Sequence, residues 1–346
     1  MSGAWRIYGA EMSPYSVKVR AYFRYKGLPH EWIVRSGGRM EEFGALAKLP
    51  LIPLVVDPDG VAAQDSTPII EAVEARHPQP SIHPEEPVAA FASALLEEYG
   101  DEWGNKWMFH LRWAREVDQL AGATRIARTI EPDADEDRHR AIAAQVRERM
   151  VGRVGFVGSN AGTAPIIEAS FLDALRLLER HLATRPYLFG ARPAFADFGI
   201  WAQVRSAFTD PTGYGIVANR TPGVLDWIAR MEWPRVEGPF EDWASLEPTL
   251  GPLLRAEVGA RFLPWSLANA AAIPWARPRG WAAPPPTLRH RAWSGRRVPP
   301  ACRAGPAPPS AWGRPGGRVH SAGTARSRRR RPGGRAGSEA PWAARA

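Results

Sequence analysis

The sequence has 346 residues, of which 45% are hydrophobic and 23% are charged, and its formal net charge is +9. This length allows two domains, and the composition excludes a collagen, a wholly disordered chain and a bundle of membrane-spanning helices. The positive charge belongs to the C-terminal part: residues 275–346 contain 16 Arg and one Glu, whereas residues 1–274 contain 29 basic and 35 acidic residues. We therefore expect a mildly acidic folded part followed by a basic tail.

The first eighty residues alternate between strand and helix patterns. Ser13 can cap a helix and Pro14 suits its first position, and the spacing of apolar residues indicates that this helix runs to residue 26. We expect strands at 5–8, 31–34, 52–56 and 61–64, and a further helix at 65–77. The order is β-α-β-(loop or helix)-β-β-α, which predicts a small α/β domain over residues 1–78.

Residues 78–87 contain four prolines and are typical of a linker. Beyond it the apolar spacing is helical, and we expect helical segments at 88–119, 135–153, 163–183, 194–208, 222–231 and 249–272. They predict an all-helical domain over residues 88–273. Residues 274–346 are rich in Arg, Pro and Gly and poor in core-forming residues, so we expect a disordered tail. Its composition also fits an out-of-frame extension of a GC-rich gene.

The only cysteine, Cys302, lies in that tail, which excludes an internal disulfide or a thiolate metal cluster. The eight histidines show no metal-ligand spacing with carboxylates, and no glycine-rich phosphate loop follows a strand. We expect neither a metal nor a nucleotide. The N-terminus lacks the pattern of a secretory signal, and no stretch approaches the ~20 apolar residues that a membrane span needs. We therefore expect a soluble, cytoplasmic protein.

Three short motifs follow one another in the first domain. They are the tetrapeptide Ser13 to Ser16 between the first strand and helix, Ile52-Pro53 at a later strand, and Asp65-Ser66 at a helix start. This ordered set, with a helical domain behind it, resembles the glutathione S-transferase family. The tetrapeptide is similar to the glutaredoxin pattern Cys-Pro-Tyr-Cys with serine in place of both cysteines, so disulfide exchange through the protein is disfavoured.

The resemblance covers residues 4–272 and implies a thioredoxin-like N-terminal domain, an all-helical C-terminal domain and glutathione as co-substrate. The glutathione thiol has an ordinary pKa of about 8.5, and lowering it by about two units requires ~2.7 kcal/mol. One hydrogen bond to a charged group contributes about 1.5–3 kcal/mol, and a helix N-terminus adds a favourable dipole. Ser13 meets both conditions and is the expected activating residue, although it can also act only as a helix cap. Tyr8 is a competing activator and could otherwise contact the substrate, and Ser16 is less well aimed.

The resemblance also implies the residues that bind glutathione. Pro53 is expected to be the cis-proline of the fold, so that the backbone of Ile52 pairs with the cysteinyl part of glutathione like an added strand. Asp65 and Ser66 are expected to bind the γ-glutamyl end, with help from Gln64, although the family usually has Glu or Gln where Asp65 stands. A trans proline and simple capping of the helix remain the alternatives.

In the helical domain, Trp103, Trp107 and His110 recur on one face and could line an apolar pocket for the second substrate. Packing in the helical core is the better explanation of the tryptophans. Ala194 to Asp197 resembles a helix-start box of the family that has lost its capping hydroxyl, a loss worth about 1 kcal/mol.

We thus expect a cytoplasmic, homodimeric glutathione transferase of the detoxification type, which conjugates the glutathione thiolate to a hydrophobic electrophile. One alternative is a non-catalytic member of the same fold that binds glutathione or another ligand. Another is nucleic-acid binding through the basic run Arg326 to Arg331, which would be sequence-blind and salt-dependent.

Overall fold

The computed structural model describes residues 4–37 and 39–276, and the side chains of residues 273–276 are excepted. The last helix of the described part continues through Ala276, two residues beyond the point where the tail was expected to begin. The rest of the expected tail, with Cys302 and the run Arg326 to Arg331, lies outside the described residues.

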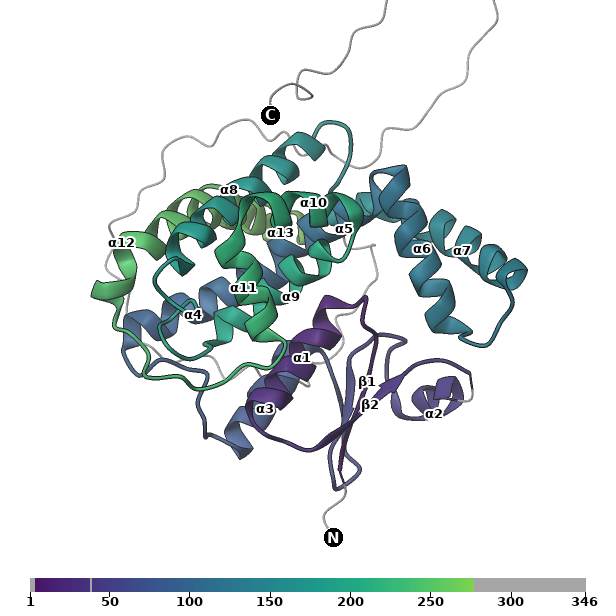
Figure 1. The fold of residues 1–346 in the computed structure, drawn as a ribbon, viewed down its shortest axis with the longest axis horizontal. Helices are drawn as coiled ribbons and strands as arrows, with labels where there is room; N and C mark the ends of the chain where they lie inside the picture. Colours follow the sequence, from purple (N-terminus) through teal and green to yellow (C-terminus); the bar gives the residue numbers. More distant parts are fainter. Residues whose placement is uncertain (1–3, 38, 277–346) are drawn as a thin grey trace, which may run out of the picture. The chain divides into compact units, whose positions relative to one another are not determined.

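The N-terminal domain contains a four-stranded sheet in the order β2-β1-β3-β4 (Figure 1). Its strands are β1 (Trp5–Gly9), β2 (His30–Val34), β3 (Leu54–Val56) and β4 (Ala62–Gln64). β1 and β2 are parallel, and the other two pairs are antiparallel. This is the thioredoxin-like domain that the sequence predicts.

Helices cover both faces of this sheet. Helices α1 (Pro14–Tyr25) and α3 (Ser66–Arg76) pack against each other on one face, and α2 (Arg39–Leu46) covers the other (Figure 1). The segment expected as a loop or a helix is therefore the helix α2. Its Phe43 joins a buried cluster with Tyr8, Ile33, Leu54 and Val56, because every second residue of a strand points to the same face.

The C-terminal domain is helical, as predicted. Its helices are α4 (Pro87–Tyr99), α5 (Asn105–Trp113), α6 (Glu116–Ile130), α7 (Glu136–Val151), α8 (Ala164–Leu182), α9 (Phe195–Phe208), α10 (Pro211–Arg220), α11 (Pro222–Met231), α12 (Trp243–Leu253) and α13 (Leu263–Ala276). Wide π-helical turns at Gly100–Gly104 and Leu254–Phe262 join α4 to α5 and α12 to α13, and a 3-10 turn lies at Val154–Val157.

The expected helix over 88–119 is interrupted twice. The π-helical turn separates α4 from α5, and α5 ends at Trp113, with two residues between it and the start of α6. The side chain of Gln119 donates a hydrogen bond to the Trp113 carbonyl at this end. Helix α10 was not expected, because Gly213, Gly215 and Asn219 give it a low helix propensity.

Helix α9 is the central element of the helical domain and also contacts α1 of the first domain. The ring of Phe198 on α9 lies against Tyr22 and Tyr25 of α1, at 5.8 and 6.0 Å between ring centroids. Aromatic side chains of α1 and α9 therefore form an apolar contact between the two domains.

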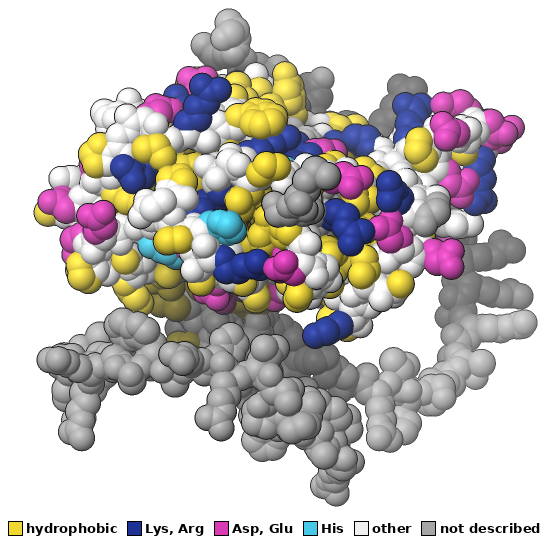
Figure 2. Space-filling model, turned by 90° about the horizontal axis from the view of Figure 1, so that it is seen from below, with side chains coloured by type: hydrophobic (Ala, Val, Ile, Leu, Met, Phe, Trp, Pro, Cys, Tyr) yellow, Lys and Arg dark blue, Asp and Glu magenta, His cyan; other side chains and the backbone are white. Residues whose placement is uncertain are grey.

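Across the described part of the chain, we find no helix with the length and apolar character that crossing a membrane requires. Figure 2 shows basic and acidic side chains interspersed with hydrophobic ones on one face of the molecule.

Candidate functional site

The strand register brings the three sequence motifs to one edge of the sheet. Leu54 on β3 is the cross-strand partner of both Tyr8 on β1 and Gln64 on β4. The segments that follow β1, precede β3 and follow β4 therefore leave the sheet at the same edge. These segments carry Ser13, Ile52, Pro53, Asp65 and Ser66, which together we call the sheet-edge site. Helices α1 and α3 both begin there.

Ser13 is the N-cap of α1, as predicted, and its side-chain oxygen accepts a hydrogen bond of 3.3 Å from the backbone N–H of Ser16. The side chain is half-buried. Within residues 4–37 and 39–276, no acceptor takes the Ser13 hydroxyl hydrogen. The first turn of α1 contains no acidic residue, so the helix dipole there favours an added negative charge. Ser13 can therefore donate a hydrogen bond to an anion at the mouth of α1.

The Ile52–Pro53 peptide bond is cis, as predicted. The backbone N–H and C=O of Ile52 have no hydrogen-bond partner within the described ranges. Gln64 is instead committed to the preceding loop: its amide nitrogen donates to the carbonyls of Leu49 and Leu51, at 2.8 and 2.7 Å. Gln64 thus holds the loop that presents Ile52.

Asp65 and Ser66 differ in their surroundings. Asp65 is exposed, has a positive φ of 79° and makes no side-chain cap of α3. Non-glycine residues with positive φ are uncommon and occur often at functional sites. Ser66 is only 2% exposed, and its hydroxyl lies 3.4 Å from both Lys18 Nζ and Asp101 Oδ2.

Lys18 is a residue of this region that the sequence analysis missed. Its ammonium group is fully buried beneath the start of α3 and forms ion pairs with Glu97 of α4 and with Asp101 at 2.6 Å. It also donates to Thr67 Oγ1 at 3.1 Å. Burial lowers the pKa of Lys18, but the two carboxylates raise it by more, so the net shift is upward. The sequence signal was a lysine between two valines of α1, and its partners lie about 80 residues away.

This buried cluster joins the two domains directly behind the sheet-edge site. Burial raises the pKa of Glu97 to about 7, although the nearby Lys18 ammonium opposes the shift. The hydroxyl of Tyr15, inside the tetrapeptide motif, donates to the backbone carbonyl of Asp101 at 3.0 Å. The start of α1 is therefore held against the helical domain by an ion cluster and by a neutral hydrogen bond.

Tyr8 does not present its hydroxyl to the start of α1. The ring lies in the cluster beneath α2, and the hydroxyl donates to Glu42 Oε1 at 2.5 Å and lies 3.2 Å from an Arg6 nitrogen. Burial and the bond to Glu42 raise the pKa of Tyr8 to about 12. This hydroxyl is already committed within the N-terminal domain.

Trp103, Trp107 and His110 are buried inside the helical domain, each at most 2% exposed. The indole N–H groups of both tryptophans donate to Ser170 Oγ, at 2.8 and 2.9 Å. The His110 ring nitrogens lie 2.7 Å from Ser159 Oγ and 2.9 Å from Glu168 Oε1. These are the contacts of core side chains.

The altered helix-start box of α9 is satisfied by Asp197. Its carboxylate accepts hydrogen bonds from the backbone N–H groups of Ala194 and Leu188 and from the Trp227 indole, each at 2.9 Å. Burial raises the pKa of Asp197 to about 7, against these three donors. The box is therefore structural even with alanine at the cap.

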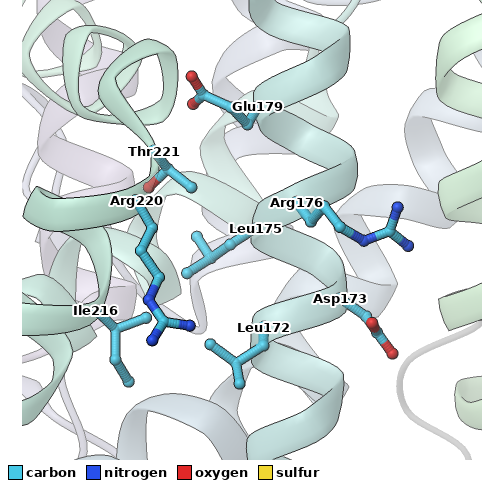
Figure 3. Close-up of a pocket in the computed structure, with 8 residues that line it drawn as sticks. All are labelled: Leu172, Asp173, Leu175, Arg176, Glu179, Ile216, Arg220 and Thr221. Carbon is cyan, nitrogen blue, oxygen red and sulfur yellow. The ribbon is translucent and has the colours of Figure 1, made fainter. Parts of the chain in front are cut away.

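A separate pocket of about 310 Å³ lies in the helical domain, between α8 and the segment around the end of α10. Figure 3 shows the Arg220 guanidinium facing the side of Leu172 and Leu175, whereas Arg176 points away. The Glu179 carboxylate in its wall accepts hydrogen bonds from the backbone of Gly223 and Val224. This pocket shares no residue with the sheet-edge site.

For residues 4–37 and 39–276, we find no group of three or more His, Cys, Asp or Glu side chains arranged to hold a metal ion.

Two family models match the sequence. The model for the glutathione S-transferase N-terminal domain matches residues 7–81, and the model for the C-terminal domain matches residues 133–230. Together they account for half of the chain. No curated protein matches the sequence.

Solved structures also resemble the chain. A glutathione S-transferase from Methylobacterium radiotolerans, in complex with glutathione sulfonate, is 20% identical, with 66% of this chain and 91% of that chain covered and a TM-score of 0.40. The β-etherase LigF from Sphingobium is 18% identical, with 66% and 95% covered and a TM-score of 0.47. A Tau class glutathione S-transferase from mango is 16% identical, with 67% and 89% covered and a TM-score of 0.40.

Proposed function

The chain belongs to the glutathione S-transferase family, and we propose that it binds glutathione at the sheet-edge site and conjugates the glutathione thiolate to a hydrophobic electrophile. The observation that carries this proposal is the Ser13 hydroxyl. It stands at the N-terminus of α1, accepts one backbone hydrogen bond, and keeps its hydrogen available within the described part of the chain.

Ser13 would act by donating a hydrogen bond to the glutathione thiolate, which forms when the thiol releases its proton to water. A hydrogen bond to a charged group contributes about 1.5–3 kcal/mol, which corresponds to a decrease of about one to two units in the thiol pKa. The α1 dipole adds to this effect. The thiolate then attacks an electron-poor carbon, a sulfur–carbon bond forms, and the leaving group departs with the bonding electron pair. The protein forms no covalent bond.

The rest of the sheet-edge site would hold the tripeptide in place. The backbone groups of Ile52, which have no partner among the described residues, can pair with the cysteinyl backbone of glutathione. The first N–H groups of α3, at Ser66 and Thr67, can bind the γ-glutamyl carboxylate, and the exposed carboxylate of Asp65 can bind its ammonium group. Lys18 supports this arrangement from behind through its contacts with Ser66 and Thr67. A homodimer, a cytoplasmic location and a role in detoxification stay predictions.

The ultraviolet absorption of bound glutathione at neutral pH tests this proposal. The parent protein should show the absorption of a thiolate, and Ser13→Ala should bind glutathione without it. Ser16→Ala is the matched control, because Ser16 is fully buried and its hydroxyl has no partner among the described atoms; it should keep the thiolate signal. Bound glutathione that absorbs only as a thiol in the parent would instead support a non-catalytic glutathione-binding protein.

A further inference from the structure

A second pocket, of about 510 Å³, lies between α1, the start of β2 and the residues that follow α11. We propose that it binds a planar aromatic compound that carries an anionic group such as a carboxylate. The residues that carry the argument are Arg20, Arg24, His30, Trp32 and Trp233, and we call the site the two-tryptophan pocket. It is distinct from the sheet-edge site: Arg20 follows Ser13 by seven residues along α1, about 10 Å at 1.5 Å per residue.

Two tryptophan rings form walls of this pocket. Trp233 is 63% exposed, which is a large exposure for the largest aromatic side chain, and Trp32 is half-buried. An arginine covers each ring: Arg24 lies 3.9 Å from the Trp233 centroid, and Arg20 lies 4.3 Å from the Trp32 centroid. These stacks orient the indoles before any ligand arrives, and the exposure of Trp233 leaves ring surface on which another aromatic group can stack.

The position of Trp32 is fixed further by a glycine. A side-chain carbon on Gly9 would approach the Trp32 ring to 2.5 Å and the Ser16 side chain to 2.9 Å. The indole therefore occupies the space that a larger residue at position 9 would fill. This wall of the pocket is rigid, which lowers the conformational cost of binding.

The charges around the pocket are unbalanced in favour of an anion. Three guanidinium groups, those of Arg20, Arg24 and Arg205, share two carboxylates. Glu11 binds both Arg20 and Arg205, and Glu232 binds both Arg24 and Arg205. One positive charge therefore remains in excess. It is poorly screened by water, since Arg20 is only 7% exposed.

The pKa values of two lining residues, Arg24 and His30, are both lowered, as expected beside an excess of positive charge. Burial lowers the pKa of Arg24, and the charge of Arg20 lowers it further. Burial also lowers the pKa of His30, and the charges of Arg24 and Arg20 lower it further, whereas the hydrogen bond that its ring N–H donates to the Leu28 carbonyl opposes the shift. A bound anion would relieve this repulsion. Its aromatic part would contact Trp233 and its charged group would lie near Arg24.

The size of the pocket suits such a ligand, since small-molecule sites usually measure about 300–1,000 Å³. Arginine is also the side chain best adapted to bind a carboxylate in two-pronged geometry and to stack on aromatic rings. A neutral aromatic compound would use only the indoles, and inorganic phosphate would use only the guanidinium groups. The combination on one surface therefore indicates an aromatic anion.

Isothermal titration calorimetry on the full chain tests this inference with naphthoate and its uncharged analogue naphthamide. Saturating S-hexylglutathione is present throughout, so that its peptide part fills the sheet-edge site and its hexyl group fills the adjoining space that would receive the electrophile, which we call the electrophile site. Naphthoate should bind at least tenfold more tightly than naphthamide. Trp233→Ala should weaken naphthoate binding at least tenfold. Phe91→Ala, a matched removal of an aromatic residue that is 67% exposed on α4, should leave the affinity unchanged.

A second variant separates the charge from the ring surface. Arg24→Gln should reduce the preference for naphthoate over naphthamide and should change naphthamide binding less. Absence of naphthoate binding, equal binding by the parent and Trp233→Ala, or equal affinity for the two compounds would each overturn the inference. Binding that occurs only without S-hexylglutathione would assign the compound to the electrophile site, which also overturns it. None of these outcomes depends on Ser13 activating a thiol.

Discussion

Two serine hydroxyls, one in each domain, show how the same chemical group is used for folding and for binding. Ser170 is fully buried on α8, accepts hydrogen bonds from two indole N–H groups and donates to Glu257 Oε2 at 2.5 Å. Ser13 is half-buried at a helix end, accepts one hydrogen bond, and its hydrogen has no acceptor within residues 4–37 and 39–276.

The difference lies in how much each site would lose by holding an unpaired group. A buried polar group without a partner costs about 1–3 kcal/mol, and the buried Ser170 hydroxyl avoids this cost by accepting two hydrogen bonds and donating one. A half-buried group can exchange hydrogen bonds with water until a ligand arrives. Within the described residues, the Ser13 hydroxyl of the sheet-edge site therefore keeps a donor for a glutathione thiolate, whereas the Ser170 hydroxyl already donates to Glu257.

The largest effect expected from a single substitution tests the structural side of this comparison. Ser170→Ala removes the hydroxyl that accepts from two buried indole N–H groups and donates to Glu257, which keeps its donors Tyr99 and Arg261, so the free energy of unfolding should fall by about 3 kcal/mol. Urea denaturation measures this change. The control is Ser36→Ala, in a loop, which should change stability by less than about 0.5 kcal/mol. A Ser170 variant as stable as the control would contradict the structural role of this network.

The next effect tests the functional side. Ser13→Ala should lower kcat with an electron-poor aryl chloride by about 10- to 100-fold, because it removes a hydrogen bond made to the charged sulfur. The Michaelis constant for glutathione should change much less. Ser13→Thr keeps a hydroxyl and should retain most of the activity. Equal kinetics in the parent and the alanine variant would reject Ser13 as the activating residue.

A smaller effect is expected at the competing hydroxyl. Tyr8→Phe removes the bond to Glu42 and should reduce stability by about 1 kcal/mol, while kcat stays within about twofold of the parent, because this hydroxyl faces α2. Steady-state kinetics and urea denaturation on the same preparation measure both quantities. A loss of turnover comparable with that of Ser13→Ala would show that Tyr8 acts on the thiol.

A more gradual effect concerns pH and not the loss of one side chain. The folded-state pKa of Asp197, about 7, exceeds the usual value of about 4, so this carboxyl binds its proton more tightly when folded. Its contribution to stability is complete below about pH 4 and is lost as the pH rises to about 7. Relative to Asp197→Asn, which does not titrate, the parent should lose unfolding free energy across this range. A constant difference between the two would mean that the three N–H donors keep the carboxylate ionised throughout.

Much of the first domain could be predicted from its sequence, because its signals are local. The cap and proline at the start of α1 lie next to the helix that they begin, and the alternation of strands and helices follows from short apolar patterns. The cis bond at Ile52–Pro53 was expected from the family resemblance and is present.

The remaining features depend on contacts between residues far apart in the sequence. The partner of Tyr8 is Glu42, and the sequence does not show which face of the sheet α2 covers. Lys18 meets Glu97 across the domain boundary, and Trp107 meets Ser170 across 63 residues. Apolar spacing predicts that such side chains are buried, but only the packed structure shows whether their polar atoms are already paired.

The π-helical turn at Gly100–Gly104 has a consequence for insertions and deletions. It adds residues to a helical path that would otherwise continue regularly, and Asp101 lies within it while Trp107 follows it. Deleting one residue here would rotate one side of the path relative to the other by about 100°. Either Asp101 would swing away from Lys18, or Trp107 would swing away from Ser170. The number of residues in this short stretch therefore fixes the angular relation between the domain contact and the helical core.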